Sequence, residues 1–147
     1  LGYPERTRHW VHRTMEELFS HEPDGLQGDE DNGSMCAWYL FGALGFYPLT
    51  PGVPEYTLGS PLFARVRVRT ENGKELVILS EGGARSETDG DEVFLNESKL
   101  GRLYVRHEEL AAGGSLLFRR KPNAVRPECG IEGLPYSLST ATREAAR

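Results

Sequence analysis

Three acidic residues stand in a row early in the chain: Asp29, Glu30 and Asp31. A long apolar segment, Met35 to Leu44, follows almost at once. In an extended loop, residues two apart point to the same side, so the carboxylates of Asp29 and Asp31 are predicted to face one way and Glu30 another. Two such carboxylates can share a proton, polarise a water molecule, or bind a hard cation such as calcium through oxygen.

A purely structural interpretation of this acidic motif also stays open. Asp29 and Asp31 suit helix caps and a solvated turn, because acidic residues are favoured just before a helix. A free-standing EF-hand loop is excluded: with Asp29 as the first ligand, the fifth position is Gly33, and the register that suits Gly33 ends on Tyr39 instead of glutamate.

The composition is that of an ordinary globular protein. The chain has 147 residues, 38% of them hydrophobic and 27% charged, with a formal net charge of −5. This length suits one domain or two small ones. The negative charge gives no general attraction to nucleic acid or anionic membranes, and the longest apolar run is shorter than the ~20 residues of a membrane-spanning helix. We therefore expect neither partner.

Two helices are predicted in the first 50 residues. The first covers Arg6 to Ser20, and the second covers Ser34 to Leu44, with Asp31 or Asn32 as its cap and Gly45 as its end. The first has an apolar stripe that should be its buried face. Its members are Trp10, Val11, Met15, Leu18 and Phe19.

The second predicted helix has no polar face. A helix that is apolar all round must be surrounded by protein, and one amphipathic helix is not enough to surround it. We expect its other neighbours to be helices that this chain does not contain. The alternative is that the following β region covers it.

From about residue 51 the hydrophobic pattern changes to a period of two, which indicates strands. An Asn72-Gly73 turn predicts a hairpin between residues 63–69 and 75–79. A second strand pair is predicted between 93–95 and 102–105, then a helical turn over 107–114 and a last strand over 115–118. The residues therefore predict an α+β chain, in which helices precede an antiparallel β module.

The segment "GDEDNGSMCAWYLFGALGFYPLTPGVPEYTLGSPLF" closely resembles the signature segment of glycoside hydrolase family 92, the exo-acting α-mannosidases. The resemblance continues through "RVRVRTENGKELVI" and "YVRHEELAAGGSLLF" and covers roughly residues 8 to 123. The chain departs from the family pattern at Ser34 and Cys36, where glutamine and serine are usual.

The resemblance implies that the chain is the C-terminal portion of a larger enzyme. Residues 1–50 would be the end of its (α/α)6 barrel, contributing two helices. Residues 51–122 would form an antiparallel β-sandwich-like module, and residues 123–147 a poorly ordered tail. The missing N-terminal part of the polypeptide is then an expected partner.

The resemblance also implies calcium-dependent hydrolysis of terminal α-linked mannose, from N-glycans and other mannose-containing glycans, with inversion. Asp29 and Asp31 are the candidates for the general base, with Asp31 favoured and the choice left open. Asp31 or Glu30 is implied to lie near the calcium. The general acid, a glutamate in this family, is expected outside the chain, so we expect the chain alone to be inactive.

A non-catalytic carbohydrate-binding or interaction module is the alternative function. Four aromatic residues suit a sugar-stacking platform, although their spacing favours a place in the core. They are Trp38, Tyr39, Phe46 and Tyr47. His107 is predicted to be a hydrogen-bonded turn residue. The arginines at positions 65, 67 and 69 are predicted to form a solvated row on one strand.

Some properties stay open at this stage. The linkage preference, the oligomeric state and the pairing of Cys36 with Cys129 are not specified by the residues. The compartment is open as well. Secretion is one alternative, and in that case the triplet beginning at Asn96 would be a glycosylation sequon.

Overall fold

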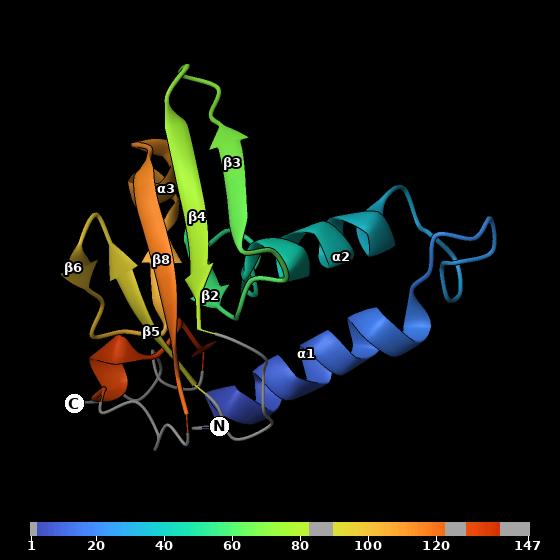
Figure 1. Ribbon diagram of the computed structural model, residues 1–147, viewed down its shortest axis with the longest axis horizontal. Helices are drawn as coiled ribbons and strands as arrows, with labels where there is room; N and C mark the ends of the chain where they lie inside the picture. Colours follow the sequence, from blue (N-terminus) through green and yellow to red (C-terminus); the bar gives the residue numbers. More distant parts are fainter. Residues whose placement is uncertain (1–2, 83–89, 123–128, 139–147) are drawn as a thin grey trace.

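A computed structural model of the chain describes residues 3–82, 90–122 and 129–138. Two helices lie side by side and extend away from a five-stranded sheet (Figure 1). The elements are α1 (Pro4–Leu18), α2 (Ser34–Leu44), β1 (Phe46–Tyr47), β2 (Glu55–Leu58), β3 (Arg65–Arg69), β4 (Glu75–Glu81), β5 (Gly90–Leu95), β6 (Ser98–Lys99), β7 (Tyr104–Arg106), α3 (His107–Ala111), β8 (Gly114–Lys121) and the 3-10 helix Ile131–Gly133.

The strands form two sheets, with orders β1-β2-β7 and β3-β4-β8-β5-β6. Helices and sheets are mixed as the α+β prediction requires, but the antiparallel prediction is wrong at one pair, because β4 and β8 run parallel. Parallel neighbours need a long connection. Here β5, β6, β7 and α3 all lie between β4 and β8 in the chain.

The predicted hairpin is confirmed by the pairing of β3 with β4, in which Arg69 lies opposite Glu75. Gly73 takes a positive φ of 79° in the connecting turn, a conformation that costs glycine little. The side-chain amide of Asn72 donates a hydrogen bond of 2.8 Å to the Ala111 carbonyl, which holds the hairpin tip against the end of α3.

The second predicted strand pair is not formed. β5 pairs with β6 and β8, whereas β7 pairs with β2 in the other sheet. The reason is a tight turn at Asn96 and Glu97, where φ is 46° and 70°. This turn folds Ser98–Lys99 straight back onto β5, and the chain then leaves for the second sheet.

The hydrophobic core draws on both sheets and on α3. Its members come from seven elements and the most deeply buried ones lie on β4, β7 and β8. The core residues are Phe46, Leu58, Leu76, Ile78, Val93, Val105, Leu110, Leu116 and Phe118. Phe46, one of the four aromatic residues considered for a platform, therefore belongs to the core, as its spacing favoured.

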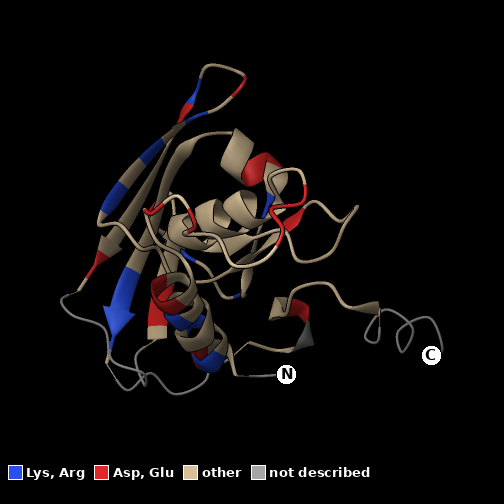
Figure 2. Cartoon of the chain, turned by 90° about the vertical axis from the view of Figure 1, so that its right-hand side faces the viewer, with Lys and Arg blue, Asp and Glu red and all other residues tan. Residues whose placement is uncertain are grey.

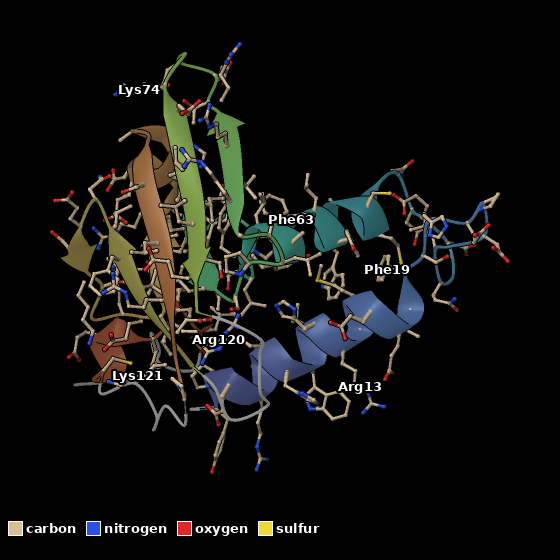
Figure 3. All side chains as sticks on the ribbon, in the orientation of Figure 1. Arg13, Phe19, Phe63, Lys74, Arg120 and Lys121 are labelled. Carbon is tan, nitrogen blue, oxygen red and sulfur yellow. The ribbon has the colours of Figure 1, made fainter. Side chains whose placement is uncertain are left out.

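The predicted apolar stripe of α1 is only partly its buried face. The buried residues of α1 are Arg8, His12 and Met15, whereas Trp10 is 56% exposed. The guanidinium of Arg13 lies 5.1 Å from the Trp10 ring and points away from α2 (Figure 3). Periodicity failed here because it counts apolar residues, and two of the buried side chains are polar.

These polar side chains join α1 to the β region. His12 Nε2 lies 2.8 Å from the carbonyl oxygen of Ser60, and the Ser60 hydroxyl donates to the Asp91 carboxylate. Burial lowers the pKa of the Arg8 guanidinium, although the negative charge of Asp91 acts in the opposite direction.

Helix α2 begins and ends at the predicted residues. Gly45, with φ 89°, ends it in the left-handed conformation, and its N–H bonds the carbonyls of Phe41 and Gly42. Near the other end, the ring of Phe19 stacks on Trp38 at 5.6 Å and contacts Tyr39 at 5.1 Å (Figure 3). The helix is therefore held by α1 on one side.

Much of α2 stays uncovered. Only Ala43 of its residues is buried, and Leu40 is 58% exposed. The alternative in which the β region covers this helix is therefore wrong for the part of the chain that the structure describes. No described helix combines the length and the apolarity needed to cross a membrane.

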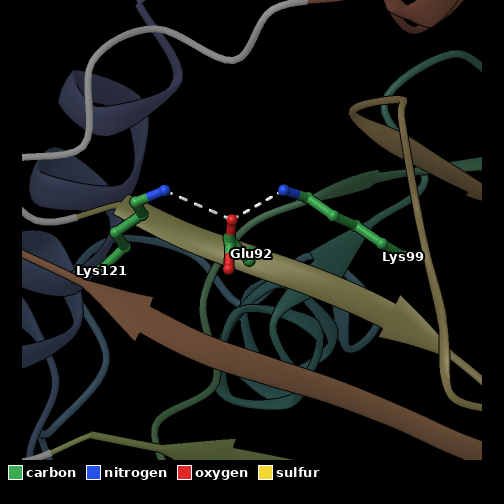
Figure 4. A network of polar contacts seen from close by, with 3 residues as sticks. All are labelled: Glu92, Lys99 and Lys121. Carbon is green, nitrogen blue, oxygen red and sulfur yellow. Dashed lines mark hydrogen bonds and ion pairs between the residues drawn. The ribbon is translucent and has the colours of Figure 1, made fainter.

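The outer face of the five-stranded sheet is charged. The three arginines of β3 are exposed on an edge strand, as predicted. Toward the other edge of the same face, one carboxylate oxygen of Glu92 lies 2.6 Å from the Lys99 ammonium and 3.4 Å from that of Lys121 (Figure 4). This network links β5, β6 and β8.

The predicted tail lies mostly outside the described residues. Within the described part, the carbonyl of Gly133 accepts a 2.7 Å hydrogen bond from Leu103, and the Tyr136 N–H donates to Glu55. Residues 129–138 are thus attached to the β region. Cys36 and Cys129 are both free thiols.

A carboxylate organises the start of α3. Glu109 Oε2 accepts a 2.8 Å hydrogen bond from the Arg106 N–H, and Oε1 lies 2.5 Å from the Arg102 guanidinium. Burial by itself raises the pKa of the Glu109 carboxyl, but these hydrogen bonds and the neighbouring positive charges outweigh it, so that the pKa is lowered.

A pH dependence of stability follows from Glu109. Because its pKa is lower in the folded than in the unfolded chain, its contribution is fully present above the unfolded value of about 4.3 and is lost as the pH falls through the folded pKa. Urea unfolding at pH 7 and pH 3 should show a smaller acid loss in Glu109→Gln than in the wild type. Equal losses in the two proteins would contradict this.

Candidate active site

The acidic motif lies in the connection between α1 and α2, at the end of α2 that is remote from the five-stranded sheet (Figures 1 and 2). Asp29 and Asp31 are exposed, whereas Glu30 is half-buried. Asp31 and Asn32 have φ of 47° and 59°. The backbone is therefore left-handed at Asp31, and the extended geometry used to align the two carboxylates does not apply there. Asp and Asn are the side chains that tolerate this conformation best after glycine.

Glu30 turns back onto the start of α2. Its Oε1 accepts a 3.2 Å hydrogen bond from the Cys36 N–H, and its carbonyl accepts bonds of 3.0 Å from both the N–H and the hydroxyl of Ser34. The N-cap position is Gly33, so the prediction of Asp31 or Asn32 as the cap is wrong. The helix takes its side-chain acceptor from further back in the loop.

Ser34 and Cys36, the two positions where the sequence departs from the pattern of the family that it resembles, both contact Glu30. The Ser34 hydroxyl is engaged within the loop, where it donates to the Glu30 carbonyl. Cys36 contributes its backbone N–H. A hydrogen bond from the Cys36 thiol to the Glu30 carboxylate raises the pKa of that thiol above its ordinary value.

The exposed carboxylates of Asp29 and Asp31 are the type of ligand that a hard cation prefers, but two side chains are too few to complete its coordination shell. Calcium takes six to eight oxygen ligands, and carboxylate oxygens are among those it prefers. Within the described residues, no group of three or more His, Cys, Asp or Glu side chains is placed to hold a metal ion. Asp29 and Asp31 can therefore supply only part of a calcium shell.

The remaining candidates have local roles. His107 Nδ1 lies 3.0 Å from the Tyr56 hydroxyl, which confirms the prediction of a hydrogen-bonded histidine. Trp38 and Tyr39 are half-buried against Phe19, so within this chain they pack and do not form an open platform. Tyr47 is 36% exposed.

Two features of the structure were missed by sequence reasoning. One is the polar cluster of Arg8 and His12 on α1 with Ser60 and Asp91, which lie about 50 and 80 residues further along the chain. The other is the capping role of Glu30. A glycine directly before a helix was the available signal, since glycine has no side chain and the acceptor must come from elsewhere.

Residues 1–121 match the family model of the glycosyl hydrolase family 92 catalytic domain. This chain belongs to glycoside hydrolase family 92. None of the curated proteins matches it.

Solved structures of family 92 members share the fold. The family 92 inverting mannosidase BT2199 from Bacteroides thetaiotaomicron is 37% identical, with a TM-score of 0.80. The family 92 α-mannosidase BT3965 from the same organism, solved with mannoimidazole, is 30% identical, also with a TM-score of 0.80. The family 92 glycosyl hydrolase ccman5, at 23% identity and a TM-score of 0.69, supports the fold alone.

The matches cover most of this chain but little of the relatives. The alignment with BT2199 spans 94% of this chain and 19% of BT2199, and that with BT3965 spans 92% and 18%. The chain thus spans about a fifth of the length of each of these family 92 mannosidases.

The raised pKa of Cys36 predicts low thiol reactivity. A thiol reacts as its thiolate, so a higher pKa leaves less of the reactive form at pH 8. Alkylation of Cys36 by iodoacetamide, followed by mass spectrometry, should be slower than in Glu30→Gln, where the negative charge is gone. The same rate in both proteins would contradict a role for the Glu30 charge.

Proposed function

We propose that this chain is part of a calcium-dependent, inverting exo-α-mannosidase and that it supplies the general base of the active site. The observation that carries the proposal is the arrangement of the acidic motif. Two carboxylates, Asp29 and Asp31, are exposed at the start of an apolar helix, while Glu30 is turned inward. Membership of family 92 and the mannosidase activity of BT2199 and BT3965 support the substrate class, terminal α-linked mannose.

Inverting hydrolysis of a glycoside needs two carboxyl groups on opposite sides of the sugar. One protonates the leaving oxygen, and the other removes a proton from the attacking water, with about 6.5–9.5 Å between them. Asp29 and Asp31 are separated by one residue in a single loop, so both approach from one side. We assign them the side of the water, with Asp31 favoured as base, and place the acid outside this chain.

The proposed base acts by simple proton transfer. The Asp31 carboxylate accepts a hydrogen bond from the water, orients its lone pair toward the anomeric carbon, and takes the proton as the new C–O bond forms. The leaving oxygen receives its proton from the acid on the opposite side, so the configuration at the anomeric carbon is inverted. Asp29, beside it, helps to orient the water.

Of the two residues that the resemblance implied for the calcium shell, Asp31 or Glu30, we assign this role to Asp31 and not to Glu30. The Asp31 side chain is exposed, whereas the Glu30 carboxylate already accepts the Cys36 N–H and its second oxygen is buried. Because no described group of three or more His, Cys, Asp or Glu side chains is placed to hold a metal ion, we expect the shell to be completed by ligands from the rest of the polypeptide. Bound calcium would supply orientation and electrostatic stabilisation at the sugar hydroxyls.

The exposed face of α2 supports a larger assembly. A helix whose side chains are almost all apolar requires neighbours on every side. Phe19 covers one side of α2 and the core contacts Phe41 near its C-terminal end, but Leu40 stays 58% exposed. We propose that the remaining helices of an (α/α)6 barrel cover the rest and that this covering forms the wall of the sugar-binding pocket opposite Asp31.

A substitution in the motif tests the catalytic assignment. In the full-length polypeptide that carries this chain, Asp31→Asn should lower kcat for an α-linked mannobioside by about 10²–10⁴-fold, the usual contribution of a general base, with an unchanged circular dichroism spectrum. Asp24→Asn, a change at an exposed acidic residue of the same connection, is the control. Near-normal turnover in Asp31→Asn would rule it out as the base.

A surface substitution tests the proposed covering of α2. Leu40→Gln should change the unfolding free energy of this 147-residue chain by no more than about 0.5 kcal/mol, because the side chain is 58% exposed. In the full-length polypeptide the same change should cost about 2 kcal/mol or more, as expected for a polar group placed in a core. Equal small effects in both would contradict the proposed barrel.

A further inference from the structure

The start of α2 has an uncommon backbone that requires support. Asp31, Asn32 and Gly33 are left-handed one after another, with φ of 47°, 59° and 89°. Left-handed residues other than glycine are unfavourable and persist only where the surrounding structure holds them in place. Asp31 is one of these residues, so its position depends on whatever holds this segment.

Glu30 is the residue that holds both ends of the left-handed segment. Its carbonyl accepts hydrogen bonds of 3.0 Å from the N–H and from the hydroxyl of Ser34, the first residue of α2. Its carboxylate Oε1 accepts a 3.2 Å bond from the N–H of Cys36, the third residue of the helix. The loop between Glu30 and Ser34 is thus closed by three hydrogen bonds to one residue.

The usual source of a helix cap is missing here. The N-cap residue is Gly33, which has no side chain, and the structure shows no side-chain cap hydrogen bond from that position. The N–H groups at a helix start need acceptors, and a carboxylate is a strong one because it also interacts favourably with the positive end of the helix dipole. Glu30 takes this role from three residues before the N-cap.

We propose that Glu30 is the positioning residue of this active site: it fixes the left-handed turn that presents Asp31 and Asp29 to the substrate, and it does not itself bind the sugar or transfer a proton. The inference rests on the proposed function. It divides the three acids into one that supports the loop from within and two that face outward.

Two conservative substitutions separate positioning from a direct role. Glu30→Gln keeps the length of the side chain and an oxygen acceptor but loses the charge. Glu30→Asp keeps the charge but is one methylene shorter, so it withdraws the carboxylate from the Cys36 N–H. A base or a calcium ligand needs the charge, whereas a positioning residue needs the reach.

In the full-length polypeptide, Glu30→Gln should keep kcat within about threefold of the wild type, while Glu30→Asp should lower it by about 10²-fold, the usual effect of a small misplacement of a catalytic group. KM should change little in either. Asp24→Ala is the matched control. The opposite order, with Gln impaired and Asp active, overturns the proposal, and so does full activity in both variants.

Amide exchange tests the same contact without any activity. In this 147-residue chain, the Cys36 N–H should exchange about tenfold faster in Glu30→Asp than in the wild type, and at a similar rate in Glu30→Gln. Unchanged exchange in Glu30→Asp overturns the proposal. Faster exchange with undiminished turnover overturns the positioning role but leaves the proposed function intact, whereas normal turnover in both Asp29→Asn and Asp31→Asn overturns the proposed function itself.

Discussion

Helix α2 carries more apolar surface than the described part of the chain covers, and the rest of the structure is arranged around this excess. Phe19 holds its N-terminal half, and the aromatic rings of Phe46 and Tyr56 hold Phe41 near its C-terminal end. Between these two contacts, Leu40 faces solvent. The helix is thereby a firm support for the acidic loop at its start, and its open side is where the rest of a pocket can form.

The two ends of the chain's helical part are attached by different kinds of interaction. Around α2 the contacts are aromatic and apolar. Such contacts exclude water and depend on how well the side chains pack. Between α1 and the β region they are polar and partly charged, through His12, Ser60 and Asp91. Polar contacts of this kind are directional and specify one arrangement, because a buried polar group without its partner is costly. The helices therefore have a defined orientation relative to the sheets.

Local signals in the sequence predicted the elements whose causes are local. The bounds of α2 follow from its apolar residues and from Gly45, and the β3–β4 hairpin follows from its Asn-Gly turn. The buried face of α1 could not be predicted in the same way, since His12 is explained by a carbonyl 48 residues further along. The strand pairing of β5 was predicted wrongly for a related reason. Its turn at Asn96 and Glu97 contains no glycine, so the sequence carried no clear turn signal there.

The candidate site was likewise predictable only in part. The acidic motif and its family likeness singled out Asp29, Glu30 and Asp31; the comparisons show membership of family 92, and the roles of these three residues stay predictions. The fold of the loop was not predictable from spacing, because three left-handed residues in succession replace the extended backbone that spacing assumes. β8, the last strand of the five-stranded sheet, lies between β4 and β5. During synthesis, β4 and β5 therefore emerge from the ribosome before β8, and each has one edge without a partner strand. The sheet can form its two central pairs only after residue 121 has emerged, and until then these edges are exposed to pairing with other chains.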